Sequence, residues 1–381
     1  MTDVYISGAG IHPFGRFDTT TTDMGVVAVR EALAEAGVGR GDFQAAFCAT
    51  AYGGVASGHK VLGRLGITGG VPIVDVEAGC ASGGAALALA SGAIRSGQIE
   101  TALVFGVEKM PRGIIRSSFF ESWQEEAGLA STPAYFALRA QRLMQTSGVT
   151  KDHLAAVVVK NRRHGVSNPD AMFRSEVDAD AVLASRVVCD PLHLWMLCSP
   201  NEGAAAVVLT SRETGRSGGA GQVKLASAVL RSHVPGAALS ESTPLSGLAR
   251  DDVPSPSTMA ADAAYEESGI SPDDLDVVEC QDTDAAREML SYEELHLCRL
   301  GGSSELVEKG ETTKEGRIPV NPSGGLLSKG EPLGASALGQ VHELVRQLQG
   351  RAGDRQVPNA KVALAHTVGR GANASVVILT R

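Results

Sequence analysis

Short apolar runs and stretches with helical spacing alternate along the first hundred residues. Residues 23–36 carry apolar side chains three and four positions apart and end at Gly37, a residue type favoured directly after a helix. The apolar runs predict strands at residues 4–8, 43–50, 73–76 and 102–107. This order of strands and helices predicts an α/β fold, in which helices cover a mostly parallel or mixed sheet.

The pattern changes over residues 110–190, which carry more charged residues and isolated aromatic residues. Helical spacing predicts two helices there, at 134–146 and 151–161. We interpret this part as a loop domain inserted into the α/β fold. An apolar strand returns at 202–210, and a Gly- and Ser-rich connector at 212–221 predicts a domain boundary.

The chain beyond the connector repeats the chain before it. Residues 42–48 match residues 274–280, and residues 79–83 match residues 330–334 in the same order. Matched segments in matched order predict a duplicated α/β unit, with the two turns facing each other across a pseudo-twofold axis. The predicted halves are residues 1–221 and residues 222–381.

Cys80 is the first candidate for chemistry. It stands between the apolar run at 73–76 and an Ala-rich helical stretch that reaches about Ser96. A sulfur at the start of a helix faces free N–H groups and the positive end of the helix dipole, which favour thiolate over thiol. Cys80 is therefore predicted to be an activated nucleophile. The alternative is a buried structural cysteine.

Composition narrows the classes of function. The net charge of −9 argues against binding of nucleic acid through its phosphates, and aromatic residues make up only 4% of the chain. The six cysteines lack paired CxxC spacing, which favours thiols of a reducing, cytoplasmic compartment over disulfides or a metal site. No signal peptide and no membrane-spanning run is expected.

Two loops resemble those of the thiolase family. Residues 75–83 (DVEAGCASG) resemble its nucleophile loop, and residues 321–336 (NPSGGLLSKGEPLGAS) resemble its NPSGGLLSKGHPLGAT loop. Residues 156–164 and 190–208 are similar to the sterol-carrier-protein-x, or lipid-transfer, branch. The resemblance implies a five-layer αβαβα fold built from two thiolase halves, a loop domain over the site, and a homodimer.

The chain departs from this family at three catalytic positions. Glu331 replaces the histidine of the GHP motif, and Gln281 and Thr283 replace the histidine and cysteine of the HDCF motif of this branch. The last family loop keeps His366. The resemblance therefore implies a catalytic set of Cys80, Glu331, His366 and Gln281. It implies substrate contacts at Ser82, Asp282, Thr283, Ser328, Gly369, Gly371 and Arg163.

Further residues have two readings each. Four basic residues are predicted either to hold the phosphates of coenzyme A or to form a solvated face. They are Lys160, Arg162, Arg163 and Arg174. Three further residues are predicted either to line the substrate channel or to pack in the core. They are Trp195, Met196 and Cys198.

Three functions are compatible with these residues. The first is a thiolase-type acyltransferase that makes or cleaves a carbon–carbon bond of a 3-oxoacyl-CoA through an acyl-Cys80 intermediate. The second is a retro-aldolase acting on a CoA-bound side chain, a reaction associated with this branch. The third is a non-catalytic acyl-CoA or lipid binder. The resemblance implies coenzyme A thioester as substrate, no permanently bound cofactor or metal, and a zinc-ribbon OB-fold (DUF35-type) partner subunit.

Overall fold

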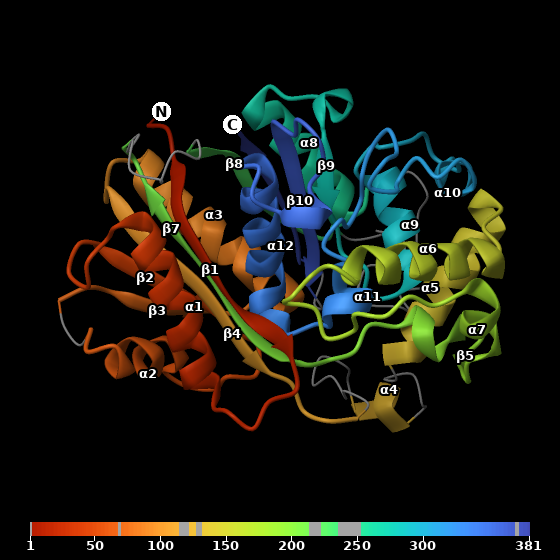
Figure 1. The fold of residues 1–381 in the computed structure, drawn as a ribbon, viewed down its shortest axis with the longest axis horizontal. Coiled ribbons are helices and arrows are strands. Elements are labelled where there is room, and N and C mark those ends of the chain that lie inside the picture. Colours follow the sequence, from red (N-terminus) through yellow and green to blue (C-terminus); the bar gives the residue numbers. More distant parts are fainter. Residues whose placement is uncertain are drawn as a thin grey trace.

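The computed structural model describes residues 2–67, 70–113, 122–126, 132–212, 222–234, 253–369 and 373–381 (Figure 1). Within these residues nine strands form one sheet of order β3-β2-β4-β7-β1-β8-β11-β10-β9. The first half supplies β1 (Tyr5–Gly15), β2 (Ala45–Ala49), β3 (Ile73–Val76), β4 (Thr101–Lys109) and β7 (Glu202–Thr210). The second half supplies β8 (Val223–Ser232), β9 (Val277–Glu279), β10 (Val362–Gly369) and β11 (Asn373–Thr380).

Strand pairing in the second half repeats that in the first. β2 and β4 are parallel, and β4 pairs antiparallel with β7, which pairs antiparallel with β1. In the same way β9 and β10 are parallel, and β10 pairs antiparallel with β11, which pairs antiparallel with β8. The two halves join through a short β1–β8 pairing at Tyr5 and Ile6. The duplicated α/β fold predicted from the repeated segments is confirmed.

The two halves of the sheet and three layers of helices form five layers in all. α1 (Thr21–Ala36) and α2 (Ser57–Arg64) pack on the outer face of the first half. α3 (Ser82–Arg95) and α12 (Leu333–Leu348) share the central core with strands of both halves, while α8 (Pro256–Ser268) and α9 (Ala285–Glu294) cover the outer face of the second half. Gly83 permits close packing of α3 on α12, because a Cβ atom there would lie 3.0 Å from the Cβ atom of Ala337.

The region between β4 and β7 lies beside the second half. It contains α4 (Ser122–Glu126), α5 (Thr132–Ser147), α6 (Lys151–Gly165), α7 (Ala179–Ala184), β5 (Val187–Cys189) and β6 (Leu192–His193). The two helices predicted in this region are present as α5 and α6. In the second half, α10 (Ser303–Glu308) and α11 (Gly325–Lys329) lie near α6 (Figure 1). The predicted boundary at residue 221 falls outside the described residues.

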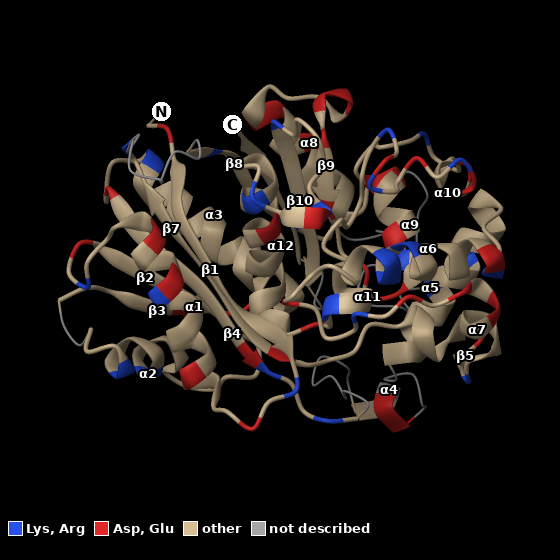
Figure 2. Ribbon diagram, viewed as in Figure 1, with Lys and Arg blue, Asp and Glu red and all other residues tan. Residues whose placement is uncertain are grey.

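Charged residues avoid the middle of the sheet. β1, β4 and β7 carry acidic or basic residues only at their ends, if at all (Figure 2). Their interiors are therefore available for apolar packing between helix layers. Across the described ranges, no helix combines the length and the apolar run required to cross a bilayer.

Candidate active site

Cys80 lies in a tight turn between β3 and α3. Gly79 has φ of 60°, a left-handed value that favours glycine, and residues Gly79–Ala81 form one 3-10 turn. The Ser82 hydroxyl fixes this turn, because it accepts a hydrogen bond from the Ala78 N–H at 2.8 Å and donates one to the Gly79 carbonyl at 2.5 Å. The Cys80 side chain therefore lies in a set position at the positive end of the α3 dipole.

The last residue of β10 supports the same turn. A Cβ atom at Gly369 would lie 1.9 Å from the carbonyl oxygen of Ala78, so only glycine allows this approach. Gly369 was predicted to contact substrate, and the structure places its backbone directly behind the Cys80 turn. Gly371 lies outside the described residues.

Glu331 lies just before α12, and its backbone is anchored on the segment that leads into β7. Its N–H donates to the Ser199 carbonyl at 2.9 Å. Both carboxylate oxygens accept hydrogen bonds. Gln281 donates from Nε2 to Oε1 at 2.9 Å, and Cys198 donates from Sγ to Oε2 at 3.2 Å. Two of the three substituted family positions, Gln281 and Glu331, are thus in direct contact.

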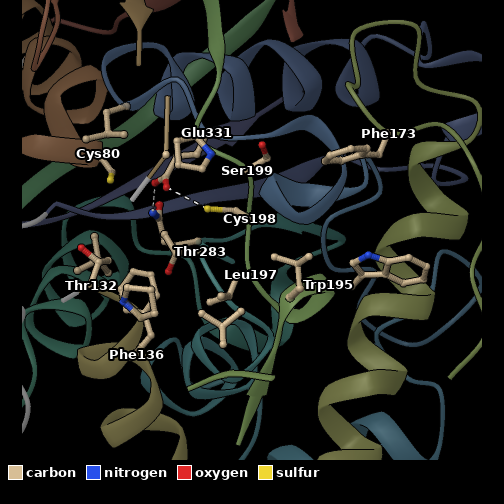
Figure 3. Close-up of a pocket in the computed structure, with 18 of the residues that line it drawn as sticks. Cys80, Thr132, Phe136, Phe173, Trp195, Leu197, Cys198, Ser199, Thr283 and Glu331 are labelled. Carbon is tan, nitrogen blue, oxygen red and sulfur yellow. Dashed lines mark hydrogen bonds between the residues drawn. The ribbon is translucent and has the colours of Figure 1, made fainter. Parts of the chain in front are cut away.

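Cys80 and Glu331 line one cavity of about 530 Å³. Figure 3 shows the Cys80 side chain directed toward the space in front of Glu331. Gln281, Thr283 and Cys198 line the same cavity. Its apolar walls include Phe136, Phe173, Trp195 and Leu197. The two turns that were predicted to face each other therefore line the same cavity. Residues from the region between β4 and β7 form its apolar walls.

Cys198 is the functional candidate that sequence reasoning undervalued. Burial, with the negative charge and the hydrogen bond of Glu331, raises the pKa of the Cys198 thiol well above 9.0. The thiol is therefore protonated near neutral pH. The sequence alone predicts either channel lining or core packing for Cys198, and only the structure places its thiol against Glu331. Trp195 also lines the cavity, whereas Met196 is buried in the core.

Three residues predicted to bind substrate instead hold the backbone of the site and are not part of the cavity lining. Ser82 fixes the Cys80 turn. Ser328 donates to the Asn161 carbonyl at 2.9 Å. Asp282 accepts from the N–H groups of Leu326 and Leu327 at 2.6 and 3.1 Å, at the start of α11. Burial and the nearby charge of Glu288 raise the pKa of Asp282 well above its usual value.

His366 faces away from the cavity. It is fully buried, and its Nε2 atom lies 2.9 Å from the Ser257 hydroxyl on α8. Its Nδ1 atom has no hydrogen-bond partner among the described residues. Burial lowers the pKa of His366 well below 6.5, so the ring is neutral at physiological pH. Val368, two residues along the strand, reaches the cavity instead.

The basic residues of α6 divide between three environments. Lys160 is buried against Glu288 and donates to the Val320 carbonyl at 3.0 Å, so it is unavailable to phosphates. Arg163, predicted to bind substrate, is exposed on the outer side of the helix. Its neighbour Arg162 is 8% exposed and lines the cavity. Adjacent residues differ by about 100° around a helix, which accounts for this difference.

Comparisons with known proteins agree with this architecture. The family model described as "Thiolase, N-terminal domain" matches residues 4–213, and "Thiolase C-terminal domain-like" matches residues 242–381. The benzoylsuccinyl-CoA thiolase subunit BbsB of Thauera aromatica is 35% identical over 97% of this chain and 96% of its own length. Sterol carrier protein 2 of Oryctolagus cuniculus is 35% identical over 98% of this chain and 71% of its own length. A solved structure titled "Ltp2-ChsH2(DUF35) aldolase" superposes with a TM-score of 0.85 and 23% identity, over 99% of this chain and 97% of that chain.

Proposed function

The chain belongs to the thiolase family, and from this premise we propose that it is an acyltransferase that cleaves or forms the C2–C3 bond of a 3-oxoacyl-CoA through acyl-Cys80. The observation that carries the proposal is the shared cavity of Cys80 and Glu331, with Cys198 hydrogen-bonded to that carboxylate. A nucleophile, a base and an acid are thus available in one apolar site.

Glu331 takes the place of the family histidine as proton acceptor. In the cleavage direction, it accepts the proton of the Cys80 thiol, and the thiolate attacks the C3 carbonyl carbon. The C2–C3 bond then breaks, leaving an acyl group on Cys80 and the enolate of a shortened CoA thioester. The positive end of the α3 dipole stabilises negative charge beside Cys80 during these steps.

Cys198 completes the proton transfer. Its thiol gives a proton to C2 of the enolate and regains one from protonated Glu331, to which it is already hydrogen-bonded. The thiol of free CoA then attacks acyl-Cys80, and its proton returns through Glu331 to the Cys80 sulfur. Gln281 keeps the carboxylate in place throughout, through its 2.9 Å hydrogen bond.

A retro-aldol reaction is the second candidate. Two observations support it. The carboxylate of Glu331 lies in the cavity in place of the family's histidine, and the chain is structurally similar to an aldolase solved with a DUF35 protein. Here Glu331 removes the proton of a 3-hydroxyl group, the C2–C3 bond breaks, and a carbonyl product and a thioester enolate result. No acyl-Cys80 forms on this route. A DUF35-type partner subunit is proposed on the same grounds.

A homodimer is proposed from the free edge of the sheet. Within the part of the chain that the structure describes, β3 is the terminal strand in the sheet order, and its Val74 side chain is 43% exposed. Leu89 on α3 is 53% exposed. An unpaired strand edge with exposed apolar side chains favours pairing with a second copy.

Intact-mass measurement after brief incubation with 3-oxoacyl-CoAs tests the main proposal. An adduct of acyl mass is expected on the wild-type protein and on Cys198→Ala, and none on Cys80→Ala. Absence of the adduct from all three proteins, with the same esters bound, would exclude acyl transfer. Cleavage of a 3-hydroxyacyl-CoA by Cys80→Ala would instead establish the retro-aldol route.

A further inference from the structure

Arg162 is a buried cation on the wall of the cavity. It lines the cavity at 8% exposure, and among the described residues it forms no ion pair. Its Nε atom is fully enclosed and has no hydrogen-bond partner there. Its guanidinium group lies over the ring of Phe173, whose centroid is 4.2 Å from Cζ.

Other buried cations of the same region are each paired with a carboxylate. These pairs are Lys160 with Glu288, Lys329 with Glu279, Arg139 with Asp284 and Arg355 with Glu343. Enclosing a charge without a partner is costly, and stacking on an aromatic face offsets only part of that cost. Burial accordingly lowers the pKa of Arg162. A ligand that carries an anion would supply the missing partner.

We propose that Arg162 binds a carboxylate at the far end of the acyl group, so that the substrate is a dicarboxylic 3-oxoacyl-CoA. This inference rests on the proposed function and names its substrate class. The planar guanidinium group binds a carboxylate through two parallel hydrogen bonds. Figure 3 shows Phe173, the stacking partner of Arg162, on the side of the cavity away from Cys80.

The cavity walls between Cys80 and Arg162 suit the acyl chain of a dicarboxylic ester. Trp195, Leu197 and Phe136 give the cavity apolar sides that suit the methylene groups between a reacting carbonyl and a distal carboxylate. Arginine binds the anionic oxygens of the CoA phosphates in the same way as those of a carboxylate, so the anion that pairs with Arg162 has two candidate sources. Every CoA ester carries the phosphates, whereas only a dicarboxylic ester carries the second carboxylate.

Calorimetric titration of a Cys80→Ala background separates these sources, because binding is then measured without turnover. The ligands are 3-oxoadipyl-CoA, 3-oxohexanoyl-CoA and CoA itself. We expect Arg162→Gln to weaken 3-oxoadipyl-CoA about 10- to 100-fold and to change the Kd of the other two less than about twofold. Arg30→Gln, on the exposed surface of α1, is the control and should change none of them.

Two outcomes would overturn the inference. Equal weakening of all three ligands would assign Arg162 to the phosphates, and no change in any of them would make it a packing residue. Arg162→Lys keeps the positive charge, so it tests the inference even if the glutamine variant misfolds. It should still prefer the dicarboxylic ester but bind that ester more weakly than the protein with Arg162. Because these titrations need no acyl-enzyme, they can succeed even if the adduct experiment at Cys80 fails.

Discussion

The thiol of Cys198 donates a hydrogen bond to Oε2 of Glu331, with a sulfur–oxygen distance of 3.2 Å. This contact links the region between β4 and β7 to the turn before α12, within the cavity that Cys80 also lines. The two cysteines have opposite environments. Cys80 is buried at the positive end of a helix dipole, whereas Cys198 is half-buried and hydrogen-bonded to a carboxylate. One thiol is placed to attack and the other to hold a proton.

Alkylation should distinguish these two thiols. At pH 7, iodoacetamide should modify Cys80 faster than Cys198, because the pKa of Cys198 is raised by burial and by Glu331. The rate at Cys198 should rise only as the pH passes well above 9. Glu331→Gln removes the negative charge, lowers the pKa of Cys198 and should speed its alkylation. Peptide mass spectrometry over a pH series measures both rates, and equal rates at pH 7 would contradict the assignment.

Removal of the Glu331 carboxylate should affect catalysis more than binding. Glu331→Gln keeps the size of the side chain but cannot accept a proton, so kcat for thiolysis should fall about 10²- to 10⁴-fold with little change in KM. Glu266→Gln on the exposed surface of α8 is the control and should leave both constants unchanged. A steady-state assay of thioester cleavage measures both variants. Wild-type kcat in Glu331→Gln would remove this residue from the mechanism.

The backbone of the site was predictable from sequence because backbone turns follow residue type. Cys80 between a strand and an Ala-rich helix, and Glu331 in a Gly-rich loop, each marked a turn before a helix. The repeated segments then predicted that the two turns face each other, and Cys80 and Glu331 do line one cavity. Local sequence and duplication together therefore located the cavity.

The direction of individual side chains was not predictable in the same way. Asp282 is adjacent to the cavity residues Gln281 and Thr283, yet it points to the amides at the start of α11. Arg162 and Arg163 are equivalent in sequence, and only tertiary packing of α6 determines which one faces inward. His366 satisfies the family motif but lies against Ser257. Motifs identify loops, whereas packing determines which face each residue occupies.

His164 should make the fold sensitive to acid. It is buried, lies 2.9 Å from the Asn321 carbonyl through Nδ1 and accepts from the Lys314 N–H through Nε2 at 3.2 Å. Burial lowers its pKa from 6.5 to about 4. The unfolded chain therefore binds a proton between these pH values that the folded chain does not. The His164 contribution is complete above pH 6.5 and is lost as the pH falls toward 4.

The loss attributable to His164 is about 3 kcal/mol over this window. Urea unfolding of the wild type and His164→Gln at pH 7, 6, 5 and 4 measures it. The free energy of unfolding of the wild type should fall more steeply with acidification than that of the variant. Parallel pH dependences for the two proteins would show that His164 does not titrate in this way.

Gly369 connects the stability of the fold to the reactivity of Cys80. A Cβ atom at this position would lie 1.9 Å from the Ala78 carbonyl oxygen, and a backbone atom cannot yield without moving the turn. Gly369→Ala should therefore lower the free energy of unfolding by about 1–3 kcal/mol. It should also reduce the rate of acyl-Cys80 formation about 10²-fold, because displacement of a nucleophile by about 1 Å has an effect of that size.

Gly92→Ala provides the matched control on the helix that follows Cys80. Beyond the adjoining residues and the backbone of its own helix, no atom of the described residues lies within 4 Å of a Cβ placed at Gly92. Alanine is favoured over glycine inside a helix by about 0.5–1 kcal/mol. This variant should be as stable as the wild type or more stable, with unchanged acylation. If Gly369→Ala lost stability but kept full Cys80 acylation, the strand end would support the fold alone. Loss of both is expected, because the same carbonyl belongs to the turn that positions the sulfur.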